Sequence, residues 1–175
     1  MANFQFGYQL GLEPTLLVDI LTSNRYFPQT QYHQGVMMSD TTTTASPIAK
    51  GTLVEQSEGK MVLGLPHTDY QLHLLIDNPV TPSVTGKVSG TITVEALRVD
   101  LTQAGTGGRY VEPVYGRPRR IQGRITATDT TANTITVLAA CPFVCSFATA
   151  QSASDFEVGQ FVGFDVKPGA KFTQA

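Results

Sequence analysis

The stretch Val84–Leu101, VTGKVSGTITVEALRVDL, decides the fold class of this 175-residue chain. Before Ala96, the large apolar side chains share one parity: Val88, Ile92 and Val94. After it, they share the other parity: Leu97, Val99 and Leu101. A two-residue repeat is the period of a β-strand with one buried face. A change of phase within the repeat predicts a bulge or bend around Ala96, and such bends help a sheet to curl onto itself.

The same alternation recurs downstream of this stretch. The clearest hairpin is predicted over 121–139, where Ile121, Ile125 and Ala127 point inward and 129–133 supplies the turn formers. Further strands are predicted from shorter apolar runs over 61–63, 70–76 and 143–147, with a glycine-interrupted strand pair over 156–166. Threonine and valine favour pleated surfaces, and glycine and proline favour turns. We therefore predict an all-β domain of five to seven short strands over 59–175, a small Thr/Gly-rich β-barrel or compact sandwich.

The first 58 residues lack sustained alternation, and we interpret 1–58 as an extended N-terminal arm. Pro14, followed by apolar residues at helical spacing, suggests a short helix over 14–22. The stretch from residue 23 to residue 49 is polar and cannot form a hydrophobic core by itself. Aromatic and basic residues of this arm are candidate contacts with a partner protein: Phe4, Phe6, Tyr8, Arg25, Tyr26 and Tyr32.

Composition narrows the classes of partner. Lys plus Arg total 12 against 14 Asp plus Glu, for a net charge of -2, which disfavours wholesale binding of nucleic acid through a basic face. No run of eighteen apolar residues is present, so we expect no membrane span, and the first residues do not resemble a signal peptide. Charged residues make up only 15%, which is typical of a chain whose surface is partly covered by neighbours.

Five of the twelve basic residues lie within one stretch, 109–124, which we call the arginine-tyrosine segment. Its candidate site residues are Arg109, Tyr110, Tyr115, Arg117, Arg119, Arg120 and Arg124. Three interpretations are open: a solvated loop stiffened by prolines, a protein contact, or a surface for single-stranded nucleic acid. Arginine forks onto carboxylates and phosphates and stacks on rings. The acidic total of the chain favours protein over nucleic acid.

No catalytic or metal-binding motif is complete. Ser57–Lys60 matches Ser-x-x-Lys, but the Ser-Asp-Asn and Lys-Thr-Gly motifs that accompany it in acyl transfer are missing. Gly105–Gly108 lacks the Gly-Lys-Ser/Thr of a phosphate loop. No metal-ligand spacing is found among the histidines: His33, His67 and His73. Cys141 and Cys145 are interpreted as small buried hydrophobes rather than a disulfide or metal pair. We expect neither an enzyme nor a cofactor.

Two segments carry a family resemblance: GRITATDTTANTITV (123–137) and VGQFVGFDV (158–166). Together with the polar arm and the Thr/Gly-rich β-domain, they resemble the head decoration (cement) proteins of tailed bacteriophages, mainly over residues 84–166. The long segment 1–58 departs from the most compact members of that family, which leaves the role of the arm open.

The resemblance implies a non-enzymatic protein, made in the host cytoplasm, that sits on the capsid surface of the virion as a homotrimer. Its partners would be the major capsid protein and sister copies, and it would stabilise the lattice. Two alternatives remain at this point. One is a different virion subunit of the tail, neck or fibre, and the other is a barrel-type binder of single-stranded nucleic acid that stacks bases on Tyr110 and Tyr115.

Overall fold

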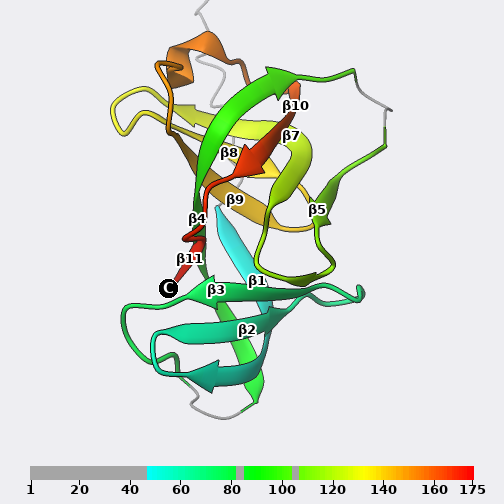
Figure 1. The fold of residues 1–175 in the computed structure, drawn as a ribbon, viewed down its shortest axis with the longest axis vertical. Helices are drawn as coiled ribbons and strands as arrows, with labels where there is room; N and C mark the ends of the chain where they lie inside the picture. Colours follow the sequence, from blue (N-terminus) through cyan, green and yellow to red (C-terminus); the bar gives the residue numbers. More distant parts are fainter. Residues whose placement is uncertain (1–46, 82–84, 104–106) are drawn as a thin grey trace, which may run out of the picture. The chain divides into compact units, whose positions relative to one another are not determined.

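The computed structural model describes residues 47–81, 85–103 and 107–175, all in the second of two compact units, 41–175 (Figure 1). This region is all-β, as predicted, with one 3-10 turn, η1 (Ala153–Asp155). The strands are β1 (Ile48–Ser57), β2 (Lys60–Gly64), β3 (Gln71–Leu75), β4 (Gly86–Leu101), β5 (Tyr110–Glu112), β6 (Tyr115–Gly116), β7 (Arg120–Asp129), β8 (Thr134–Leu138), β9 (Pro142–Phe147), β10 (Phe161–Val166) and β11 (Lys171–Gln174). In the described part of the chain, no helix has the length and apolar character needed to cross a membrane.

The long strand β4 organises the sheet, because each of its edges carries two other strands. Its first half pairs with β1 on one edge and with β11 on the other, and its second half pairs with β9 and β10. The pairings therefore return to β4 twice. A first ring contains β1, β2, β3, β11 and β4, and a second ring contains β4, β10, β7, β8 and β9. The eleven strands form one mixed sheet that is not a single closed barrel.

A bulge lies in β4 where the sequence predicts one. The inward positions are even-numbered through Ala96, and the next buried residue is Val99. Opposite this point, Phe164 pairs with Val99 but Val166 pairs with Ala96, so β4 contains one residue more than β10. The predicted change of phase is confirmed. Of the three residues predicted to share the second parity, only Val99 is buried, because Leu97 and Leu101 are 48% and 61% exposed.

The core runs through both rings as one cluster of buried apolar side chains. Its largest fully buried members include Phe143 and Phe164 in the second ring and Phe172 in the first. The predicted hairpin is confirmed as β7 and β8, with Ile121 and Ile125 buried and Ala127 half-buried. Its turn is held by the Asp129 carboxylate, which accepts from the backbone N–H groups of residues 131 and 132 at 2.9 and 2.8 Å.

The predicted boundary at residue 58 is wrong, because residues 48–57 form β1, which pairs with both β2 and β4. The inward positions of β1 begin with Ala49 and Gly51, whose small side chains conceal the alternation in the sequence. A β-carbon at Gly51 would lie 2.6 Å from the carbonyl oxygen of Gly64, so a larger residue does not fit there. The rest of the predicted arm, including the helix over 14–22, lies outside the described residues.

The strand pair predicted over 156–166 is also wrong. Residues 161–166 form the single strand β10, while 156–160 connect it to η1 through turns. The described region contains eleven strands instead of five to seven, because β1, β5, β6 and β11 were not predicted. Two or three residues, or a strand with one buried apolar residue such as Phe172, give too few repeats to reveal a period.

Glutamine side chains satisfy backbone groups at three places, one on the open edge of β4 and two in the loop after β3. The Gln151 amide accepts from the Val99 N–H and donates to the Val99 carbonyl, both at 2.8 Å. Gln174 makes the same two-way contact with the backbone of Thr81, and Gln56 accepts from the N–H of residue 80 at 2.7 Å. A carboxamide carries the same donor and acceptor as a peptide group, so each glutamine satisfies backbone groups that no neighbouring strand reaches.

We expect Gly90→Ala to lower the free energy of unfolding by about 1–3 kcal/mol. Gly90 pairs with both β1 and β11, and an added β-carbon would lie 2.6 Å from Cζ of Phe172 and even closer to the Thr173 carbonyl oxygen. Urea unfolding measures the change. Ser89→Ala, on the opposite face of the same strand, is the control and should change stability little. Equal stability of the two variants would contradict this role of Gly90.

We expect Gln151→Leu to cost about 1–3 kcal/mol, because it leaves the N–H and carbonyl of Val99 without partners. Hydrogen exchange at the Val99 amide should accelerate more than exchange elsewhere in β4. Gln103→Leu, at an exposed position, is the matched control. Unchanged protection of Val99 would show that the Gln151 amide is dispensable.

Candidate functional site

The arginine-tyrosine segment contacts both rings. Its first strand, β5, pairs with β7 in the second ring (Figure 1). The chain then passes the cis peptide before Pro113, and β6 pairs in parallel with β3 in the first ring. The backbone N–H of Gln71 donates to the carbonyl of Val114 at 2.8 Å, which extends this pairing. The segment is therefore fixed by hydrogen bonds at two separate places, and its side chains divide into two groups.

The first group lies around Arg120 on β7. Its Nη1 contacts Oδ1 of Asp165 at 2.9 Å, and its Nε donates to the hydroxyl of Tyr110 at 3.4 Å. The hydrogen bonds to Tyr110 and then Asp165 raise the pKa of Arg120. The Tyr110 hydroxyl also lies 3.5 Å from Oε1 of Gln122. The Arg120–Asp165 pair is exposed to solvent and contributes at most about 1 kcal/mol, so its main effect is to orient the guanidinium.

The second group is formed by Tyr115 and Arg117 beside β3. The ring of Tyr115 meets the ring of His73 edge to face, with centroids 4.7 Å apart and planes at 78°. Tyr115 remains 64% exposed. Nε2 of His73 is buried and has no hydrogen-bond partner among the described residues. Buried polar atoms normally have one.

The three other arginines of the segment are exposed and lie in neither group: Arg109, Arg119 and Arg124. Arg124 donates to the carbonyl of Gly159 at 2.7 Å. Arg109, Arg117 and Arg119 form no ion pair with any described residue. The backbone of Arg119 is nevertheless fixed, because its N–H donates to Glu112 and its carbonyl accepts from Val166, both at 2.7 Å. The segment thus presents unpaired guanidinium groups from an ordered main chain.

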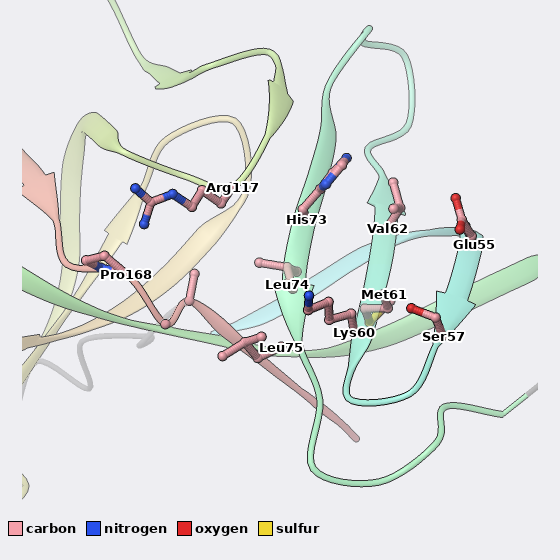
Figure 2. Close-up of a pocket in the computed structure, with 12 residues that line it drawn as sticks. Glu55, Ser57, Lys60, Met61, Val62, His73, Leu74, Leu75, Arg117 and Pro168 are labelled. Carbon is pink, nitrogen blue, oxygen red and sulfur yellow. The ribbon is translucent and has the colours of Figure 1, made fainter.

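A groove of about 580 Å³ lies beside β3, next to Tyr115, and we call it the β3 groove. Figure 2 shows its lining side chains on both sides of β3. The residues that line it are Glu55, Ser57, Lys60, Met61, Val62, His73, Leu74, Leu75, Arg117, Pro168, Gly169 and Ala170. Of these, the sequence pointed only to Arg117. The available signal was the adjacent pair Leu74 and Leu75, because an alternating strand can bury only one of them.

The remaining predicted contact residues lie outside the described residues: Phe4, Phe6, Tyr8, Arg25, Tyr26 and Tyr32.

Across the described ranges, no group of three or more His, Cys, Asp or Glu side chains could hold a metal ion. No protein-family model matches the chain, and no curated protein or solved structure matches it either.

The two cysteines are free, buried thiols, as the sequence indicated. Burial raises the pKa of Cys141 and of Cys145 to about 12, because a thiolate loses its hydration in the core. For Cys145, a hydrogen bond from the backbone of Ala96 partly offsets this effect. Thiols in such surroundings are poor nucleophiles and poor metal ligands.

We expect both cysteines to react with an aromatic disulfide reagent at pH 8 roughly a hundredfold more slowly in the native protein than in urea, since the reacting thiolate is suppressed. The raised thiol pKa values also make stability depend on pH. The two buried, protonated thiols contribute their full share of the free energy of unfolding below pH 9.0, the ordinary pKa of a thiol. This share falls progressively as the pH rises toward about 12. Rapid native labelling at pH 8 would contradict the buried, protonated state.

Proposed function

We propose that this chain is a structural virion protein that binds the outside of an assembled capsid lattice and stabilises it. The observation that carries the proposal is the display of Arg109, Arg117 and Arg119 without acidic partners on a main chain held by strand pairing. Arginine and tyrosine are enriched at the energetic centres of protein interfaces. Carboxylates on the capsid subunit or on a sister copy are the groups that these guanidiniums would meet.

The order of the segment supports an interface more than a solvated loop. A loop that must be ordered on binding loses conformational entropy, whereas β5 and β6 already hold this one in place. The other described surface cations include three that are matched with acids: Arg98 with Asp100, Lys167 with Glu95 and Lys171 with Asp77. Lys50, Lys60 and Lys87 are also unpaired among the described residues but lie on three different strands, β1, β2 and β4. The segment differs in carrying three unpaired cations together, which suits a partner that brings the acids.

Repetition would add to these contacts. Many copies on a symmetric shell, arranged as homotrimers in our proposal, turn weak single contacts into stable attachment. The aromatic and basic residues before position 47 are proposed as additional contacts with the major capsid protein and sister copies. Extended segments that cover neighbouring subunits bury much surface and lose chain entropy as they dock.

We expect the double substitution Arg109→Glu and Arg119→Glu to weaken co-sedimentation with assembled capsids encoded by the same genome by about tenfold or more. Each reversal removes one attraction and adds a repulsion with the partner's carboxylates. Lys50→Glu with Lys87→Glu changes the net charge equally at exposed positions of the first ring and is the control. Binding measured across a salt series should weaken with ionic strength.

If the wild-type chain is absent from the capsid fraction and is found with purified tails or fibres, attachment to the capsid is wrong and another virion location is right. Tight, steeply salt-dependent binding of single-stranded oligonucleotides would favour the nucleic-acid alternative. Equal capsid binding by both double variants would remove the arginine-tyrosine segment from the interface.

A further inference from the structure

We propose that the β3 groove binds a short, extended segment of a partner protein in which one apolar side chain lies between two carboxylates. This inference rests on the proposed function, since it assigns one patch of the surface to the docking of a virion partner. The groove is distinct from the arginine-tyrosine segment as a whole, because most of its lining, including Lys60, Val62 and Leu75, comes from β2 and β3.

The floor of the groove is the outward face of the β2–β3 pair. Val62 lies opposite His73 and Lys60 opposite Leu75 in the strand register, so these four side chains stand on the same face. Leu75 is 39% exposed, although Leu74 next to it is fully buried in the core. The exposed Leu75 and the half-buried Val62 form an apolar patch, against which one side chain of a partner can pack.

Two cations, Lys60 and Arg117, lie beside this apolar patch. Figure 2 shows Lys60 on the β2 side of β3 and Arg117, with Pro168, on the other side. Neither cation forms an ion pair with a described residue. Lys60 and Arg117 enter the groove from different elements, β2 and the arginine-tyrosine segment, so we assign one carboxylate of the partner to each cation. Glu55, on the Lys60 side, disfavours a third acid beyond Lys60.

His73 supplies a separate indication of a ligand. Its Nε2 is buried without a partner, and the Tyr115 ring stands against the imidazole. Because Tyr115 is largely exposed, its side chain can turn away without opening the core. A peptide group of the docked segment would then reach Nε2 and supply the missing hydrogen bond.

The position of the groove favours a segment of a larger chain over a small molecule. The groove lies on the outer face of the sheet, so a bound ligand keeps one side in solvent. Enclosed pockets bury most of a small ligand, and that burial supplies much of the affinity. A segment carried by a partner protein does not need such enclosure, because the rest of the interface and the repetition of copies add to its attachment.

The direct test is an NMR titration of the full chain with the blocked pentapeptide acetyl-Asp-Ser-Leu-Ser-Asp-amide. We expect shifts centred on the methyl groups of Val62 and Leu75 and on the His73 ring, with a dissociation constant of about 1 mM. Two control peptides carry asparagine for both aspartates, or serine for leucine, and should bind several-fold more weakly. Shifts elsewhere, equal binding of all three peptides or no binding at 10-fold higher concentration (about 10 mM) would overturn the proposal.

Variants of the protein separate the contributions. Lys60→Gln and Arg117→Gln should each weaken peptide binding about two- to fivefold, and Leu75→Ser should weaken it at least as much. The controls are Lys50→Gln and Leu97→Ser, which change an exposed lysine and an exposed leucine outside the groove. These positions are exposed, so we expect all five variants to fold, as checked by the unfolding midpoint.

The same variants in the capsid sedimentation assay distinguish failure of the groove from failure of the proposed function. Wild-type attachment to capsids with no loss in Lys60→Gln or Leu75→Ser, together with an inert peptide, leaves the proposed function standing and overturns the groove. No attachment of the wild-type chain overturns the proposed function, and the peptide titration alone then decides whether the groove binds acidic-apolar segments.

Discussion

The structure depends on β4 serving two rings of paired strands at once. β1 and β9 follow each other along one edge of β4, β11 and β10 follow each other along the other, and the two sets overlap in the middle of the strand. Two local adjustments make this possible. Gly90 lets β11 approach β4 closely, and the bulge after Ala96 changes the parity of the buried positions, so that Val99 follows Ala96 into the core. Because β4 holds the rings next to each other, the chain that leaves it can pair with β7 in one ring and with β3 in the other. The arginine-tyrosine segment is that chain.

Sequence patterns predicted the parts of the fold that repeat long enough to show a period. The phase change in β4 and the hairpin closed by Asp129 are local signals, and both are present. Strand β1 was not predicted because its first two inward positions hold the small residues Ala49 and Gly51, which do not show the apolar alternation. At Gly51, close packing leaves no room for a larger residue. The closure of the two rings was beyond local patterns, since it depends on pairings such as Lys171 with Leu75, which lie far apart in the sequence.

The candidate site was predicted in composition but not in arrangement. Clustered arginines and tyrosines are visible in the sequence, yet the partner of Arg120 is Asp165, 45 residues away, and Tyr115 on β6 packs against His73 on the neighbouring strand β3. No sequence signal marked Lys60 or Leu75 as a binding residue. Lys60, whose only motif was the rejected Ser-x-x-Lys match, joined Leu75 in one surface only when the register of β2 and β3 placed them on one face beside Arg117. Chemistry of this kind is specified by long-range pairing, which residue type and spacing do not encode.

The contact of the Gln151 amide with the backbone of Val99 affects how copies of this chain can associate at high local concentration. Open strand edges are templates on which identical chains add to one another and grow into fibres. At Val99, beyond the end of β9, the Gln151 amide occupies the open edge of β4, so a second copy cannot pair there. On the capsid shell that we propose, dense packing of copies would then depend on side-chain recognition, which has a defined geometry and ends when each site is filled.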